Sequence, residues 1–136
     1  MQKDIDIIIY GATGFTGKLC VKYFQSLNTT VNWAMAGRNL IKLEKVAKEN
    51  QTNVEILIAD SDDEKALDNL TSRARVILST TGPFHRYGSK LVASCIKNHT
   101  HYVDITGENF WVKGLIEKHH KEASAKGIRI IPSCGF

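Results

Sequence analysis

The sequence contains little proline or cysteine and has no long apolar run. Only two of its 136 residues are proline and three are cysteine, which indicates neither a proline-rich disordered chain nor a disulfide-stapled fold. No apolar stretch approaches the roughly 18 residues of a membrane span. The chain begins with the acidic residues Asp4 and Asp6 rather than with the apolar core of a signal peptide. We therefore expect a cytoplasmic protein with reduced thiols and no membrane span.

The charged residues do not form a basic stripe. Lysine and arginine number 18 against 14 acidic residues, a formal net charge of +4, and the signs alternate along segments such as 42–49 as on a solvated helix face. Nucleic-acid binders more often concentrate basic residues beside aromatic ones, so no nucleic-acid partner is expected. The histidines and cysteines lack metal-ligand spacing, and no metal site is expected either. The length fits one globular domain over residues 1–136.

Short runs rich in β-branched residues recur along the chain, and most are apolar throughout rather than alternating. Such runs are typical of strands that are covered on both faces of a parallel sheet. Between them, apolar residues recur at helical spacing, as at Leu19, Tyr23 and Leu27. The expected strands are 5–10, 31–36, 54–59, 75–79, 101–105 and 128–131.

Alternating strands and helices predict an α/β fold. Parallel strands joined by right-handed crossovers give a doubly wound Rossmann fold, and we expect a sheet of about six strands in the order 3-2-1-4-5-6. Ser61 and Glu64 have the spacing of a capping box for a helix over 62–70, and Gly127 stands where a left-handed helix cap is common. The sequence ends directly after the sixth expected strand, so we expect a truncated chain.

A glycine-rich loop directly follows the first expected strand and opens the first helix. Its glycines have the spacing GxxGxxG, a variant of the dinucleotide-binding fingerprint. In that loop Gly11 would permit the tight turn, Gly14 the approach of a pyrophosphate, and Gly17 close helix packing. The helix N-terminus offers N–H groups to phosphate; the alternative is a glycine-rich turn without a ligand. The expected cofactor-binding residues of this loop are Gly11, Thr13, Gly14, Phe15, Thr16 and Gly17.

Arg38 follows the second expected strand, where an NAD enzyme carries an acidic residue for the ribose 2'-OH. A guanidinium can instead form two hydrogen bonds to a 2'-phosphate; the alternative is an ordinary surface arginine. Asn39 either adds a hydrogen bond to the ligand or caps the following helix. The sequence therefore predicts NADP(H) as cofactor in preference to NAD(H), with Arg38 and Asn39 among the binding residues.

The ends of the third and fourth strands complete the expected crevice. Asp60 lies either beside the adenine or in the turn before Ser61, and the sequence favours neither interpretation. Small residues after the fourth strand would let the backbone pass close to the phosphates and the nicotinamide ribose. The residues expected there are Thr80, Thr81, Gly82 and Pro83.

Four segments together resemble the N-terminal domain of saccharopine dehydrogenase-like oxidoreductases, which include trans-acting enoyl reductases. They are the glycine loop 11–17, the Ala-Gly-Arg of 36–38, the Thr-Gly-Pro-Phe of 81–84 with Tyr-Gly at 87–88, and 101–108. The resemblance covers essentially the whole chain. It implies the NADP(H)-binding half of an enzyme that transfers hydride to or from an imine, carbonyl or activated alkene. It also implies a C-terminal substrate domain that is missing from this chain. Without that domain, the chain would be inactive.

The segment after the fifth strand carries further polar residues. Asp104 is expected near the nicotinamide or substrate, or as a cap for the next turn, and Glu108 could offset the dipole of a helix that begins near Asn109. Cys134 could in principle be a nucleophile, but the sequence shows no partner for it. No catalytic residue is assigned.

Two broader questions stay open in the sequence. A dinucleotide-sensing regulatory module without turnover is the alternative function. Three aromatic residues near the expected crevice, Phe84, Phe110 and Phe136, would be partly exposed or buried by another copy of the chain, so a homo-oligomer is possible.

Overall fold

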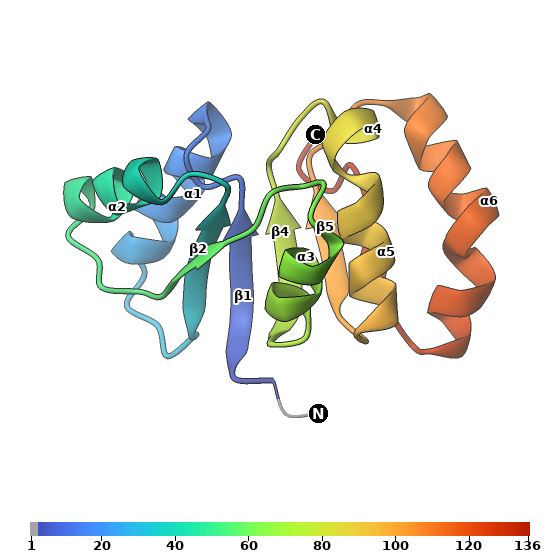
Figure 1. Ribbon diagram of the computed structural model, residues 1–136, viewed down its shortest axis with the longest axis horizontal. Helices are drawn as coiled ribbons and strands as arrows, with labels where there is room; N and C mark the ends of the chain where they lie inside the picture. The colour runs from blue at the N-terminus through green and yellow to red at the C-terminus, as the bar shows by residue number, and fades with distance from the viewer. Residues whose placement is uncertain (1–2) are drawn as a thin grey trace.

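The six expected strands form one parallel sheet in the order β3-β2-β1-β4-β5-β6, as the sequence predicted. Figure 1 shows this computed structural model, which describes residues 3–136, with helices on both faces of the sheet. The strands are β1 (Ile5–Tyr10), β2 (Trp33–Gly37), β3 (Ile56–Ile58), β4 (Ala74–Ser79), β5 (His101–Asp104) and β6 (Ile130–Ile131). The helices are α1 (Phe15–Ser26), α2 (Leu40–Glu49), α3 (Glu64–Thr71), α4 (Phe84–Tyr87), α5 (Ser89–Lys97) and α6 (Asn109–Ala125).

Two hydrophobic clusters hold the helices on the sheet. Helices α1 and α2 pack through residues such as Val21 and Leu43 against Ile9 and its neighbours. Helices α3, α5 and α6 pack through residues such as Leu91 against Ile8 and Ile77 on the other face. Both faces of β1 are thus covered, which explains why its sequence is apolar without alternation.

Two local expectations were wrong. Leu19 and Tyr23 are more than half exposed, because α1 turns Gly17 and Val21 toward the sheet instead. Ser61 does not cap α3; the Asp63 side chain accepts a hydrogen bond from Ala66 N at 3.0 Å. Short helix α4 was not predicted from the sequence. The left-handed cap at Gly127 is confirmed by its φ of +68°.

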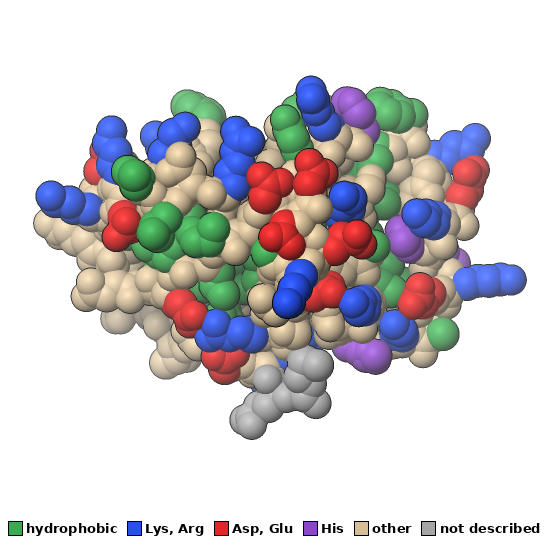
Figure 2. Space-filling view, viewed as in Figure 1, with side chains coloured by type: hydrophobic (Ala, Val, Ile, Leu, Met, Phe, Trp, Pro, Cys, Tyr) green, Lys and Arg blue, Asp and Glu red, His purple; other side chains and the backbone are tan. Residues whose placement is uncertain are grey.

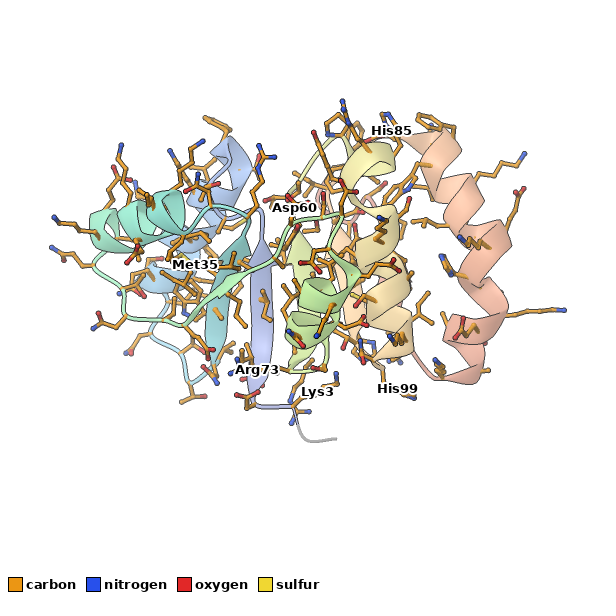
Figure 3. All side chains as sticks on the ribbon, in the orientation of Figure 1. Lys3, Met35, Asp60, Arg73, His85 and His99 are labelled. Carbon is orange, nitrogen blue, oxygen red and sulfur yellow. The ribbon has the colours of Figure 1, made fainter. Side chains whose placement is uncertain are left out.

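The two edges of the sheet carry different chemistry. At the amino ends of the strands, Arg73 forms paired hydrogen bonds with the carboxylates of Asp4 and Glu55, and Figure 3 shows Arg73 and Lys3 at this lower edge. At the carboxyl ends lie the glycine loop and the β4–α4 segment. Ligands of doubly wound sheets bind at the carboxyl edge. Within residues 3–136, none of the helices combines the length and the hydropathy needed to cross a bilayer.

Candidate cofactor-binding site

A cavity of about 270 Å³ opens where β1, β2 and β4 end. This is the point at which the strand order reverses on either side of β1, the crevice where dinucleotides bind in such folds. Arg38 is the only charged residue among those that line it, so the cavity suits an anionic ligand. The lining residues are Tyr10, Gly11, Thr13, Gly14, Gly37, Arg38, Ser61, Thr80, Thr81, Gly82 and Tyr87.

The three glycines of the loop have different structural roles. Gly11 has a φ of +84° and ends β1 in a tight turn, in which its N–H donates to Ala36 O at 3.0 Å. A Cβ at Gly17 would overlap Gly11 O and Ala12 Cα, so Gly17 provides the expected close packing, against the loop itself. A Cβ at Gly14 would meet only Gly11 O, at 3.6 Å. Gly14 therefore faces open space at the start of α1, where a phosphate could approach the backbone.

Adjacent threonines after β4 differ in how their hydroxyl groups are bonded. Thr80 Oγ1 donates to the carbonyl oxygens of Tyr10 and Gly11 at 3.2 and 3.1 Å, which ties the end of β4 to the loop. Thr81 Oγ1 is buried without a hydrogen-bond partner among the described residues. An unsatisfied buried hydroxyl costs about 1–3 kcal/mol. A phosphate or ribose oxygen in the cavity would satisfy it, so this residue fits a bound dinucleotide.

Arg38 and Asn39 both follow β2, but they have different structural roles. Arg38 is exposed and reaches the cavity. Asn39 caps α2, since its Oδ1 accepts a hydrogen bond from Lys42 N at 3.0 Å; of the two roles left open for Asn39, capping is the one observed. Ser61, expected as a helix cap, lines the cavity beside Arg38 instead.

Asp60 serves the turn after β3. Its Oδ1 accepts a hydrogen bond from Asp62 N at 2.9 Å, and it does not line the cavity. Figure 3 labels Asp60 on the segment between β3 and α3. Figure 2 shows acidic side chains gathered over the centre of this face, where Asp60, Asp62, Asp63 and Glu64 are exposed. The cavity with Arg38 thus borders an acidic surface.

Three other expected residues lie outside the cavity. Phe15 is 84% exposed at the start of α1, Thr16 is half-buried in the same turn, and Pro83 precedes α4 as an exposed residue. None of them lines the cavity in this structure. Their proposed contacts with a cofactor stay predictions.

Asp104 is only 1% exposed, and its carboxylate is turned inward. Its Oδ2 accepts from the Tyr102 hydroxyl at 2.6 Å, and its Oδ1 accepts from the backbone N–H groups of Thr106 and Ser133 at 3.0 and 2.8 Å. Burial is the main cause that raises the pKa of Tyr102 above its ordinary value, with the Asp104 charge next. Asp104 therefore caps the turn after β5, the second of its two expected roles, and does not reach the cavity.

Sequence reasoning missed Tyr10, Gly37, Ser61 and Tyr87 as lining residues. Tyr10 and Gly37 are the last residues of β1 and β2, and that position was the available signal, because strand ends meet at the carboxyl edge. The Tyr10 hydroxyl donates to Ala59 O at 3.0 Å and so joins the floor of the cavity to the end of β3.

The aromatic residues near the crevice divide into two kinds. Phe84 was expected to be partly exposed or buried by another copy of the chain, but it is buried against Trp111 of its own chain, with ring centroids 5.9 Å apart. Phe110 and Phe136 are 67% and 91% exposed, as expected. Glu108 precedes α6 without a side-chain cap hydrogen bond to that helix; its carboxylate accepts hydrogen bonds from Phe84 N and His85 N at the start of α4.

Different residues of this site suit different parts of a dinucleotide. The start of α1 at Gly14 and the free hydroxyl of Thr81 suit the pyrophosphate, and Arg38 suits a 2'-phosphate. A bound NADP(H) would supply hydride chemistry, while this chain holds and orients it.

Known proteins resemble this chain over nearly its whole length. Residues 7–131 match the family model described as saccharopine dehydrogenase NADP binding domain. Trans-acting enoyl reductases of Mycobacterium leprae and Mycobacterium tuberculosis are 40% and 39% identical to it over 138 aligned residues. Each alignment covers 99% of this chain but 33% of the relative, so the chain spans about a third of the length of these proteins.

A solved structure agrees with the fold. Apo saccharopine dehydrogenase (L-Glu forming) from Saccharomyces cerevisiae superimposes with a TM-score of 0.78 at 21% identity, covering 96% of this chain and 27% of that one. At that identity the likeness concerns the fold alone, whereas the family model covers most of the sequence. The predicted resemblance and the choice of NADP as cofactor are both confirmed, and the chain belongs to the family of saccharopine dehydrogenase NADP binding domains.

Proposed function

We propose that this chain is the NADP(H)-holding half of an oxidoreductase that reduces the carbon–carbon double bond of an enoyl substrate. The observation that carries the proposal is the buried, unpartnered Thr81 hydroxyl beside the glycine loop. The name of the mycobacterial relatives, enoyl reductase, favours an activated alkene over an imine or carbonyl substrate.

The residues of this chain bind and orient the cofactor in the proposal. The N–H groups at the start of α1 and the Thr81 hydroxyl take the pyrophosphate, and the Arg38 guanidinium takes the 2'-phosphate. Phe15, Thr16 and Pro83 then contact the bound molecule at the rim of the crevice. NADPH supplies the hydride when it is bound.

A further domain, C-terminal to residue 136, covers the crevice and positions the substrate in this proposal. The chain's share of its relatives, 33%, supports it. So does the exposed apolar surface around α6, where Phe110 lies near the carboxyl edge and a groove of about 350 Å³ runs between α6 and β6 past Leu115 and Ile131. A crevice without a cover would admit water to the reacting atoms.

Two further parts of the proposal concern the oligomeric state and the cellular compartment of the protein. The exposed apolar residues of α1 and α6 would favour pairing of two copies. The cysteines Cys20, Cys95 and Cys134 are free thiols, which fits the reducing cytoplasm.

The proposal is tested by comparing residues 1–136 with the full-length protein. We expect both to bind NADPH in a calorimetric titration, and only the full-length protein to oxidise it when a 2-butenoyl thioester is added. Turnover by residues 1–136 alone, with a monomer in sedimentation, would contradict the need for a further domain. Binding without turnover in the full-length protein on enoyl, imine and carbonyl probes would favour the regulatory module.

A further inference from the structure

The imidazole of His85 is held in one orientation at the carboxyl edge of the sheet. His85 Nδ1 lies 2.5 Å from Glu108 Oε1, although the two residues are 23 positions apart in the sequence. Figure 3 labels His85 beside α4 at the upper edge, the edge to which the strands point. The pair brings the β4–α4 segment and the start of α6 together next to the cofactor crevice.

The carboxylate that holds His85 is itself fixed by its surroundings. Glu108 Oε2 accepts from Phe84 N at 2.7 Å and Oε1 accepts from His85 N at 3.0 Å, and Thr106 Oγ1 lies 3.4 Å from Oε2. Burial acts to raise the Glu108 pKa, but the hydrogen bonds from His85 and Phe84 outweigh it and hold that pKa below its ordinary value. Glu108 is therefore a carboxylate in a set position rather than a free surface acid.

The opposite nitrogen of the ring is available to a ligand. The His85 ring packs against Phe110, with centroids 5.5 Å apart, and its side chain is 51% exposed against 21% for Glu108. Among the described residues, none is hydrogen-bonded to His85 Nε2. A carboxylate on Nδ1 selects the tautomer that carries its proton on Nδ1, so the neutral ring presents a lone pair at Nε2 and the charged ring presents an N–H.

We propose that the His85 imidazole is the proton donor of the reaction and that Glu108 is the residue that positions it. The inference rests on the proposed function. Reduction of a double bond adds one hydride, which NADPH supplies as it becomes NADP⁺, and one proton. His85 Nε2–H gives that proton to the carbon that does not receive the hydride, which leaves the imidazole neutral until water protonates it again. Gly82 and Tyr87, which precede and follow His85 in the same segment, line the cofactor crevice, and the exposed His85 side chain lies outside that lining.

The first test is the tautomer of His85 in the full-length protein. With ¹⁵N-labelled histidine in mildly alkaline solution, where imidazoles are neutral, we expect the Nδ1–H form at His85 and a shift of its Nε2 resonance when NADPH is added. The signal is assigned by its loss in His85→Asn. Glu108→Gln should release the tautomer, while Glu117→Gln, an exposed change on α6, should not. An Nε2–H tautomer, or no response to NADPH, would overturn the proposal.

The second test uses deuterated water and a 2-butenoyl thioester probe. Asparagine can keep the bond to Glu108 through its amide N–H but cannot ionise, so we expect His85→Asn to lower the rate about a hundredfold or more with the dissociation constant of NADPH unchanged within about twofold. Deuterium should enter the α-carbon on one face with the natural protein and on both faces with the variant. His99→Asn, at an exposed residue on the opposite edge of the sheet (Figure 3), should change neither property.

The outcomes separate the two proposals. Failure to bind NADPH overturns the proposed function and this inference with it. Binding of NADPH with the expected tautomer but no reduction of the probe contradicts the substrate class and supports the pair. An unchanged rate and unchanged facial selectivity in His85→Asn overturns the pair alone.

Discussion

The side chain of Thr81 fills the space beside Gly11 into which a Cβ atom would project. The positive φ of Gly11, +84°, sets the turn that brings this backbone against the end of β4. Thr81 Oγ1 is buried there without a partner among the described residues, whereas the hydroxyl of Thr80 is bonded to the loop. One threonine therefore holds the loop in place, whereas its neighbour has a hydroxyl without a hydrogen-bond partner in the wall of the cavity.

Valine substitutions should separate these two roles. Thr80→Val should lower the free energy of unfolding by about 1 kcal/mol, since two carbonyl groups lose a donor. Thr81→Val should leave stability unchanged or higher, because it removes an unsatisfied buried hydroxyl, yet weaken NADPH binding between about twofold and tenfold. Urea unfolding and calorimetric titration measure the two effects. Equal loss of stability in both variants would show that Thr81 is a structural residue.

Gly14→Val should abolish NADPH binding while the domain stays folded. An added Cβ meets only Gly11 O, at 3.6 Å, so we expect the fold to accept a side chain that occupies the approach of the pyrophosphate. Gly114→Val, at a helical glycine with no atom within 4 Å of a new Cβ, is the matched control and should bind normally. Thermal unfolding and fluorescence titration with NADPH check both variants. Normal binding by Gly14→Val would reduce the loop to a turn.

Arg38→Glu should reverse the cofactor preference. Loss of a charge-assisted hydrogen bond to the 2'-phosphate costs roughly 1.5–3 kcal/mol, which is about tenfold or more in affinity for NADPH, while the new carboxylate suits the 2'-OH of NADH. Arg129→Glu, the same change at an exposed residue before β6, should leave the preference unaltered. Equal affinity of the unmodified protein for NADPH and NADH would refute the role of Arg38.

Removal of the Arg73 guanidinium should change acid stability without affecting cofactor binding. Its hydrogen bonds lower the pKa of Asp4 and Glu55 below their ordinary values of 3.8 and 4.5. Carboxyl groups with a lowered folded pKa stabilise the fold above their ordinary pKa, and this stabilisation is lost as the pH falls through the folded pKa. Arg73→Met should therefore unfold more easily near neutral pH and lose less stability below about pH 4.5.

The pH dependence is measured by urea unfolding at a series of pH values. NADPH affinity serves as the internal control, because Arg73 lies at the opposite edge of the sheet (Figure 3). A variant with the same acid dependence as the natural protein would show that these ion pairs contribute nothing to folding.

Much of the fold was readable from local patterns. Short runs rich in β-branched residues marked all six strands. The run of β1 is apolar without alternation because both of its faces are covered, and its bounds were predicted without error. The glycine loop was also predicted, since a turn with positive φ and close helix packing demand glycine whatever surrounds them. The prediction of which face of α1 is buried was wrong. Leu19 and Tyr23 follow helical spacing, but the close packing of Gly17 decides which side of the helix contacts the loop.

The sequence by itself therefore determined the strand order and the family, because each depends on short segments whose spacing is local. Tertiary structure alone decided which polar groups are free. The Asp104 carboxylate accepts hydrogen bonds from Tyr102, Thr106 and Ser133, which precede and follow α6 in the sequence. The Glu108 carboxylate is bonded to His85 rather than to its own helix. Ser133 and His85 are brought to these carboxylates only by chain folding, over separations of 29 and 23 residues, and whether a buried carboxylate is satisfied depends on such partners.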